Sequence, residues 1–78
     1  MDDGEFLKQL TTRQYDALEG AITHGRRISV FRRGTEYVLI PKRLWNEGSR
    51  EAMDSVHPTT GEEMTLYLDE MERIEVVR

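Results

Sequence analysis

The hydrophobic pattern of this chain changes its period at Gly25, and this change restricts the fold more than any other feature of the sequence. Before Gly25, the residues Tyr15, Leu18 and Ile22 follow the spacing of one side of a helix. After Gly25, apolar and polar side chains alternate, as they do along strands with one buried face. The sequence therefore predicts one helix near the N-terminus, followed by β-structure.

The helix has signals at both ends and is predicted over about 12–24, within the segment 11–25. Thr11 and Gln14 have the spacing of a capping box, in which each side chain accepts a hydrogen bond from the backbone N–H of the other residue. Gly25 can take the left-handed conformation that ends many helices. Gly20 lies inside the helix, where glycine costs about 1 kcal/mol relative to alanine, and we expect it to permit close packing against a strand.

Five short strands are predicted after the helix. Residues 33–35, Arg-Gly-Thr, form a tight turn between the first two strands. Pro41 ends the second strand, because proline cannot donate a hydrogen bond to a neighbouring strand, and residues 42–49 are left as a connection. The strands are expected at 27–32, 36–40, 50–57, 63–68 and 74–77.

This order of elements predicts an α+β fold in a single domain, 1–78. We expect an N-terminal helix followed by a five-stranded antiparallel, strongly bent sheet that forms a small Sm-like or SH3-like barrel over 26–78. Residues 1–9 are expected to be a flexible N-terminal segment. With 78 residues and no cysteine, the chain has a small core and no disulfide. A partner or self-association is therefore expected to support it.

No apolar run in the sequence approaches the roughly 20 residues that a membrane span needs. The acidic N-terminus also lacks the basic start and apolar core of a secretory signal. We therefore expect a cytoplasmic protein with no membrane contact.

Charged residues are unevenly distributed along the chain, whose net charge is −4. Lys and Arg prevail in the middle third, residues 26–50, whereas Asp and Glu prevail in residues 51–78. In one interpretation, neighbouring strands of opposite charge pair across the sheet. In the other, the middle third is a basic strip that binds nucleic acid or a ligand. The residues of this basic strip are Arg26, Arg27, Arg32, Arg33, Lys42, Arg43 and Trp45.

Trp45 has two interpretations of its own. Its ring could stack on a base or a ligand, or its side chain could plug one end of the barrel. The acidic isoelectric point argues against nucleic acid as the partner.

Catalysis is not expected from this sequence. The serines lack a Gly-x-Ser-x-Gly elbow, and no glycine-rich phosphate-binding motif is present. His24 is expected as a favourable charge at a helix C-terminus, and His57 as a solvated turn residue. Without cysteine, these two histidines are too few for a structural zinc site. We therefore predict a non-enzymatic protein with no catalytic residue, metal site or cofactor.

Part of the chain resembles the Rof family of small acidic bacterial proteins. The resemblance rests on residues 15–21, Tyr-Asp-Ala-Leu-Glu-Gly-Ala, on Gly61-Glu62, and on residues 68–71, Leu-Asp-Glu-Met. Rof proteins carry one helix before an Sm-like barrel, and they bind the transcription terminator Rho and block its access to RNA. The contact residues that the resemblance implies are Tyr15, Asp16 and Glu19. The two carboxylates would act as acidic decoys for the RNA-binding surface of Rho.

The chain is also similar to the barrel core of WYL domains, which sense ligands or nucleic acids in bacterial transcription regulators. The similar segments are 18–27, 41–44, 68–71 and 74–76. This similarity implies binding of nucleic acid or a nucleotide-like ligand, for which the basic strip is the candidate surface.

Three hypotheses of function follow. The leading one is a regulatory binding module that acts on transcription termination through contact with Rho or another protein. The second is a module that binds nucleic acid or a nucleotide-like ligand through the basic strip. The third is a structural homo-oligomer formed through an edge strand at 74–77, because the unpaired backbone of an edge strand can bind another chain.

Overall fold

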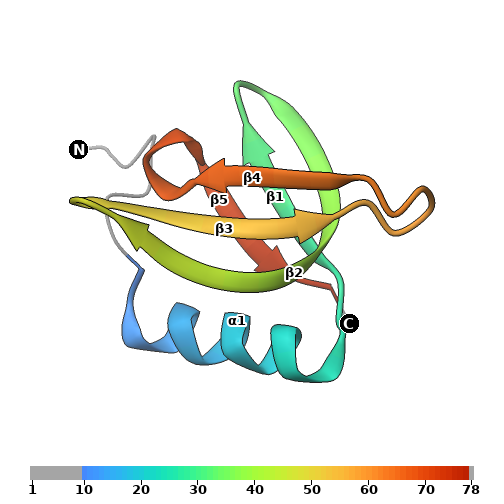
Figure 1. Ribbon diagram of the computed structural model, residues 1–78, viewed down its shortest axis with the longest axis horizontal. Coiled ribbons are helices and arrows are strands. Elements are labelled where there is room, and N and C mark those ends of the chain that lie inside the picture. Colours follow the sequence, from blue (N-terminus) through green and yellow to red (C-terminus); the bar gives the residue numbers. More distant parts are fainter. Residues whose placement is uncertain (1–9, 78) are drawn as a thin grey trace.

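The structure is a computed structural model that describes residues 10–77 (Figure 1). The expected flexible segment 1–9 lies outside the described residues. In chain order the elements are α1 (Thr12–His24), β1 (Ile28–Arg32), β2 (Thr35–Glu47), β3 (Arg50–Val56), β4 (Glu63–Tyr67), the 3-10 helix η1 (Leu68–Glu70) and β5 (Arg73–Val76). No helix within the described residues is long and apolar enough to cross a membrane.

Helix α1 begins and ends at the residues that the sequence predicted. Thr11 Oγ1 accepts a hydrogen bond from the Gln14 backbone N–H at 3.1 Å, and the Gln14 side chain accepts one from the Thr11 N–H at 2.8 Å. This capping box satisfies N–H groups that the start of a helix otherwise leaves unpaired. At the other end, Gly25 has a φ of +66° and its N–H bonds to the Ala21 carbonyl.

The strands form one open antiparallel sheet. Their order is β4-β3-β2-β1-β5, so β4 and β5 are the edge strands. The predicted α+β fold with a five-stranded antiparallel sheet is therefore confirmed. The predicted strongly bent barrel is wrong, because the sheet is neither closed nor strongly curled. A barrel requires its end strands to pair with each other, and β4 and β5 do not.

Strand β2 continues through Pro41 and changes its partner there. The first part of β2 pairs with β1, and the second part pairs with β3. The register shifts between Pro41 and Arg43, which makes Lys42 the extra residue of a β-bulge. A bulge tolerates proline because the ladder of hydrogen bonds is interrupted there. The predicted connection over 42–49 is therefore wrong, and a turn at 48–49 joins β2 to β3.

A single apolar core joins α1 to the sheet. Leu18 and Ala21 on α1 are almost completely buried, and α1 contacts β2 and β5. In Figure 1 the helix lies along the sheet beneath β2. The buried residues of this core are Leu10, Leu18, Ala21, Ile28, Val30, Leu39, Met53, Leu66, Leu68 and Met71. Full burial of a Leu or Met side chain contributes about 1.5–3 kcal/mol, so this packing fixes α1 against β2.

The glycine inside α1 has no packing role. Outside its own helix and its chain neighbours, a Cβ atom at Gly20 would have no heavy atom within 4 Å. The expected close packing of Gly20 against a strand is therefore wrong. A Cβ atom at Gly25 would also meet open space, but the backbone there has a φ of +66°. The two glycines thus differ in backbone conformation and not in packing.

Replacing each of these glycines by alanine should change stability in opposite directions. Gly20→Ala should raise the free energy of unfolding by about 1 kcal/mol, because alanine favours the helix. Gly25→Ala should lower it by about 1–2 kcal/mol, because a Cβ atom is strained in the left-handed conformation. Urea unfolding followed by circular dichroism measures both changes. Two shifts of the same sign would contradict this assignment.

Candidate functional site

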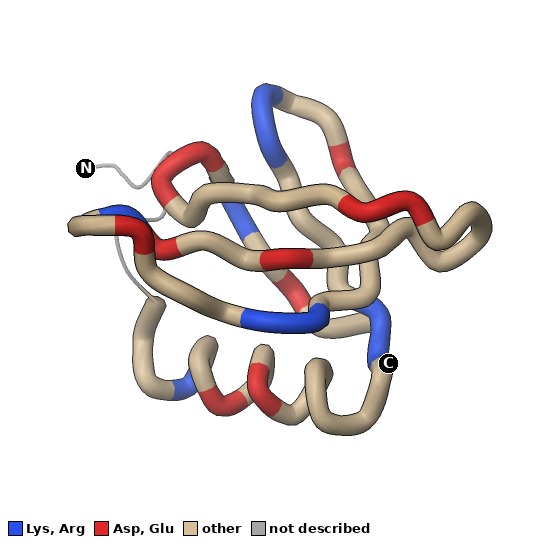
Figure 2. Tube along the Cα trace, viewed as in Figure 1, with Lys and Arg blue, Asp and Glu red and all other residues tan. Residues whose placement is uncertain are grey.

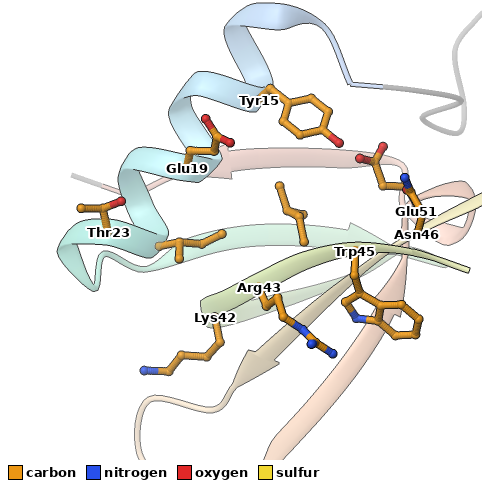
Figure 3. A pocket seen from close by; sticks show the side chains of 10 residues that line it. Tyr15, Glu19, Thr23, Lys42, Arg43, Trp45, Asn46 and Glu51 are labelled. Carbon is orange, nitrogen blue, oxygen red and sulfur yellow. The ribbon is translucent and has the colours of Figure 1, made fainter.

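A groove of about 510 Å³ lies between α1 and the second part of β2 (Figure 3). It brings together residues of two predicted sites that are far apart in the sequence. Tyr15 and Glu19 reach it from α1, and Lys42, Arg43 and Trp45 reach it from β2. The other residues that line it are Ile22, Thr23, Leu44, Asn46 and Glu51.

The less exposed part of the groove is apolar, and its borders are charged. Tyr15 and Leu44 are half-buried and pack against the core. Glu19 on one border and Lys42 on the other are exposed. Figure 3 shows Tyr15 and Glu19 projecting from α1, whereas Arg43 projects from β2 on the side away from the helix. The groove can therefore receive an apolar side chain and contact charged groups of both signs.

Trp45 belongs to a hydrogen-bonded cluster on β2, β3 and β4. Its Nε1 donates to Asp54 Oδ1 at 3.0 Å, and Thr65 Oγ1 donates to the same oxygen at 2.9 Å. The Arg43 guanidinium lies 3.1 Å from Asp54 Oδ2 and 5.5 Å from the centre of the Trp45 ring. Trp45 therefore lies over the sheet with its N–H satisfied, and the expectation that it plugs one end of a barrel is wrong.

A second cluster joins β2 and β3 to the β4–η1 segment. The Arg50 guanidinium donates two hydrogen bonds to Asp69, at 2.9 and 2.8 Å, and lies 3.9 Å from the centre of the Tyr67 ring. Tyr67 Oη donates to Glu47 Oε1 at 2.8 Å. The bond from Arg50 lowers the pKa of Asp69, and the bond to Glu47 raises the pKa of Tyr67. The sequence did not predict this cluster, because its members come from two segments, 47–50 and 67–69, that are joined only by the folded sheet.

The basic strip does not form one continuous surface. Residues 26–27 precede β1 and residues 32–33 lie at its other end, which separates the two pairs by roughly 20 Å along the strand. In Figure 2 the Lys and Arg residues lie in separate groups. Arg32 lies 3.9 Å from Glu70, and Arg43 lies 3.1 Å from Asp54. Ion pairs between the middle third and the C-terminal third thus account for part of the uneven distribution of charge along the chain.

Other cations of the strip remain exposed. These cations are Arg26, Arg27, Arg33 and Lys42. None of them forms an ion pair with any residue between 10 and 77. The strip therefore contains both internal partners of the acidic C-terminal third and cations that face solvent.

The two carboxylates of α1 lie on its exposed side. Asp16 and Glu19 are three residues apart, which places them about 60° apart around the helix. Glu19 borders the groove, whereas Asp16 borders a smaller hollow of about 400 Å³ on the other flank, together with His24, Arg26 and Val76. Neither carboxylate forms an ion pair within the described part of the chain. Both are therefore accessible to a partner.

The histidines lie apart from this groove. His24 Nδ1 is 2.9 Å from the Gly20 carbonyl oxygen at the exposed end of α1. The His57 backbone N–H bonds to the Glu62 carbonyl in the turn between β3 and β4. Across residues 10–77, no group of three or more His, Asp or Glu side chains could hold a metal ion.

Comparison with known proteins gives no family for this chain. No protein-family model matches it, and no curated protein matches it. The similarity to Rof proteins and WYL domains therefore rests on the short segments described above.

The fluorescence emission of Trp45 should change when Asp54 takes up a proton, and this should occur at an unusually low pH. The hydrogen bond from Trp45, followed by those from Thr65 and Arg43, lowers the pKa of Asp54. The stability that Asp54 contributes is therefore fully present above the ordinary aspartate pKa and is lost as the pH falls through the lowered value. Trp45 is the single tryptophan of the chain, so its emission reports on this cluster.

An acid titration of Trp45 emission measures this effect, with Asp54→Asn as the control variant. We expect a midpoint below the ordinary aspartate range in the native chain and no such transition in Asp54→Asn. A midpoint within the ordinary range, or an unchanged transition in the variant, would show that the two side chains do not interact.

Proposed function

We propose that this chain is a non-enzymatic regulatory binding module that holds a segment of a partner protein in the groove between α1 and β2. The observation that carries the proposal is the pair of accessible carboxylates on α1. Asp16 and Glu19 are exposed and form no ion pair with another described residue. The segment that fits would place an apolar side chain against Tyr15 and Leu44 and a basic side chain beside Glu19 at the border of the groove. A second basic side chain would reach over the exposed side of α1 to Asp16.

The remaining charge of the molecule supports this choice. The carboxylates of Asp54, Asp69 and Glu70 already lie beside Arg43, Arg50 and Arg32 respectively. Those on α1 have no such partner among residues 10–77, so a basic side chain of a partner can pair with them without displacing an internal cation.

Rho is the partner that the resemblance to Rof proteins implies. In such a complex Tyr15, Asp16 and Glu19 would contact the surface of Rho that otherwise binds RNA, and the chain would act on transcription termination. This role implies a cytoplasmic protein.

Nucleic acid fits the same groove less well. Lys42 and Arg43 would attract phosphates, but Glu19 and Glu51 line the same groove and would repel them. The Trp45 N–H already donates to Asp54, and the Arg43 guanidinium lies near its ring. Stacking of a base on Trp45 would therefore have to displace Arg43. A saturable change in Trp45 emission on adding single-stranded RNA at low salt, lost in Lys42→Glu, would favour nucleic acid over the protein segment.

Charge reversal on α1 should weaken binding to purified Rho. We expect the double variant Asp16→Lys, Glu19→Lys to bind Rho at least about tenfold more weakly than the native chain, because both contacts become repulsive. Fluorescence anisotropy of the labelled chain, titrated with Rho, measures the affinity.

The matched control is Glu62→Lys, Glu63→Lys. These two exposed carboxylates lie at the start of β4 and outside the groove: Glu62 precedes the strand and Glu63 is its first residue. Because two carboxylates become lysines in each case, the control has the same net charge as the α1 variant. We expect it to bind Rho like the native chain. Equal loss in both variants would reduce the effect to net charge, and normal binding by the α1 variant would remove the helix contact.

A further inference from the structure

Strand β5 ends the sheet, and its outer edge has no partner among residues 10–77. We propose that two copies of this chain pair edge to edge through β5, antiparallel, about a two-fold axis at Ile74. The inference goes beyond the groove between α1 and β2. No residue of β5 lines that groove, so a dimer of this kind leaves it open.

The backbone of β5 decides which groups face the outer edge. The Val77 N–H donates to the Arg27 carbonyl at 2.9 Å, and these two residues are opposite each other in the β1–β5 register. In an antiparallel pair, hydrogen-bonded and non-hydrogen-bonded pairs alternate. The backbone groups of Arg73 and Glu75 therefore face β1, and those of Ile74 and Val76 face the outer edge, where a second strand can bind them.

The side chains of β5 are complementary to a second copy in one register. With Ile74 opposite Ile74 of the second copy, Arg73 lies opposite Glu75 of that copy, and the reverse pair also forms. Both are non-hydrogen-bonded pairs, in which side chains of antiparallel strands lie closest. Arg73 and Glu75 are each 61% exposed. Within one chain Arg73 Nε lies 3.9 Å from Glu75 Oε2, at the long limit of an ion pair, and this contact leaves both side chains exposed to a second copy.

Two further contacts favour this register. The Arg73 guanidinium lies 4.4 Å from the centre of the Phe31 ring, which holds it on the face that Glu75 of the second copy would share. On the other face, Ile74 and Val76 are half-buried against the core, and the two Ile74 side chains would lie side by side and extend that core.

A register with the two-fold axis at Glu75, one residue further along β5, is less favourable. An axis at Glu75 would allow more backbone hydrogen bonds, but it would set two Glu75 carboxylates opposite each other at the closest spacing. Like charges directly opposite destabilise a strand pair. Opposite charges at alternate positions therefore select the axis at Ile74.

Charge exchange between two variants tests the proposal. Sedimentation equilibrium of the full chain should show a monomer–dimer equilibrium. Arg73→Glu alone and Glu75→Arg alone should each weaken the dimer at least about tenfold, because each places like charges opposite each other. An equimolar mixture of the two variants should restore dimers, since both cross-strand pairs again join opposite charges. The double variant Arg73→Glu, Glu75→Arg should also dimerise.

Mixing the two variants distinguishes a contact of Arg73 and Glu75 between two copies from a contact of these residues within one chain. Restoring dimers by mixing requires contact between copies, and circular dichroism of each variant checks that it is folded. A native chain that stays monomeric at high micromolar concentration would overturn the proposal. Dimers that both single variants form as tightly as the native chain, or a mixture that does not restore them, would also overturn it.

Discussion

The rest of the structure depends on the continuity of β2 through Pro41. The strand pairs with β1 before the proline and with β3 after it, so it holds both halves of the sheet together. The bulge at Lys42 allows this change of partner without a ladder hydrogen bond from the proline nitrogen. Because the strand continues to Glu47, Leu44 reaches the core and faces α1 across the groove, while Trp45 reaches Asp54 on β3. A strand that ended at Pro41 would leave neither the groove nor the Trp45 cluster.

Strand pairing also brings basic residues of the middle third close to acidic residues of the C-terminal third, where they form local ion pairs. Arg43 meets Asp54 across β2 and β3, and Arg50 meets Asp69 beyond the end of β4. Each pair is exposed and contributes little to stability by itself. They satisfy two carboxylates of the C-terminal third, Asp54 and Asp69, within the molecule. Accessible charge remains on α1, on the cations of the basic strip that face solvent, on the carboxylates of Glu62 and Glu63, and in the alternating pattern of β5.

The parts that could be predicted from the sequence depend on local signals. Thr11, Gln14 and Gly25 define both ends of α1 because a cap involves residues within one helical turn. Pro41 misled the prediction because a local rule cannot reveal a bulge, which depends on the partner strand. The role of Trp45 was missed because Asp54 and Thr65 reach it through the register of β3 and β4. The barrel was wrong because its closure depends on β4 and β5, which the order of elements does not bring together.

Amide hydrogen exchange measured by NMR across residues 42–49 tests the continuity of β2 most directly. Hydrogen bonds from β2 to β3 should protect alternate amides between Arg43 and Glu47, while amides of the turn at 48–49 should exchange rapidly. This result would confirm the strand that forms one wall of the groove. Exchange of every amide from Lys42 to Ser49 at the rate of an unstructured peptide would show instead that the chain leaves the sheet at Pro41.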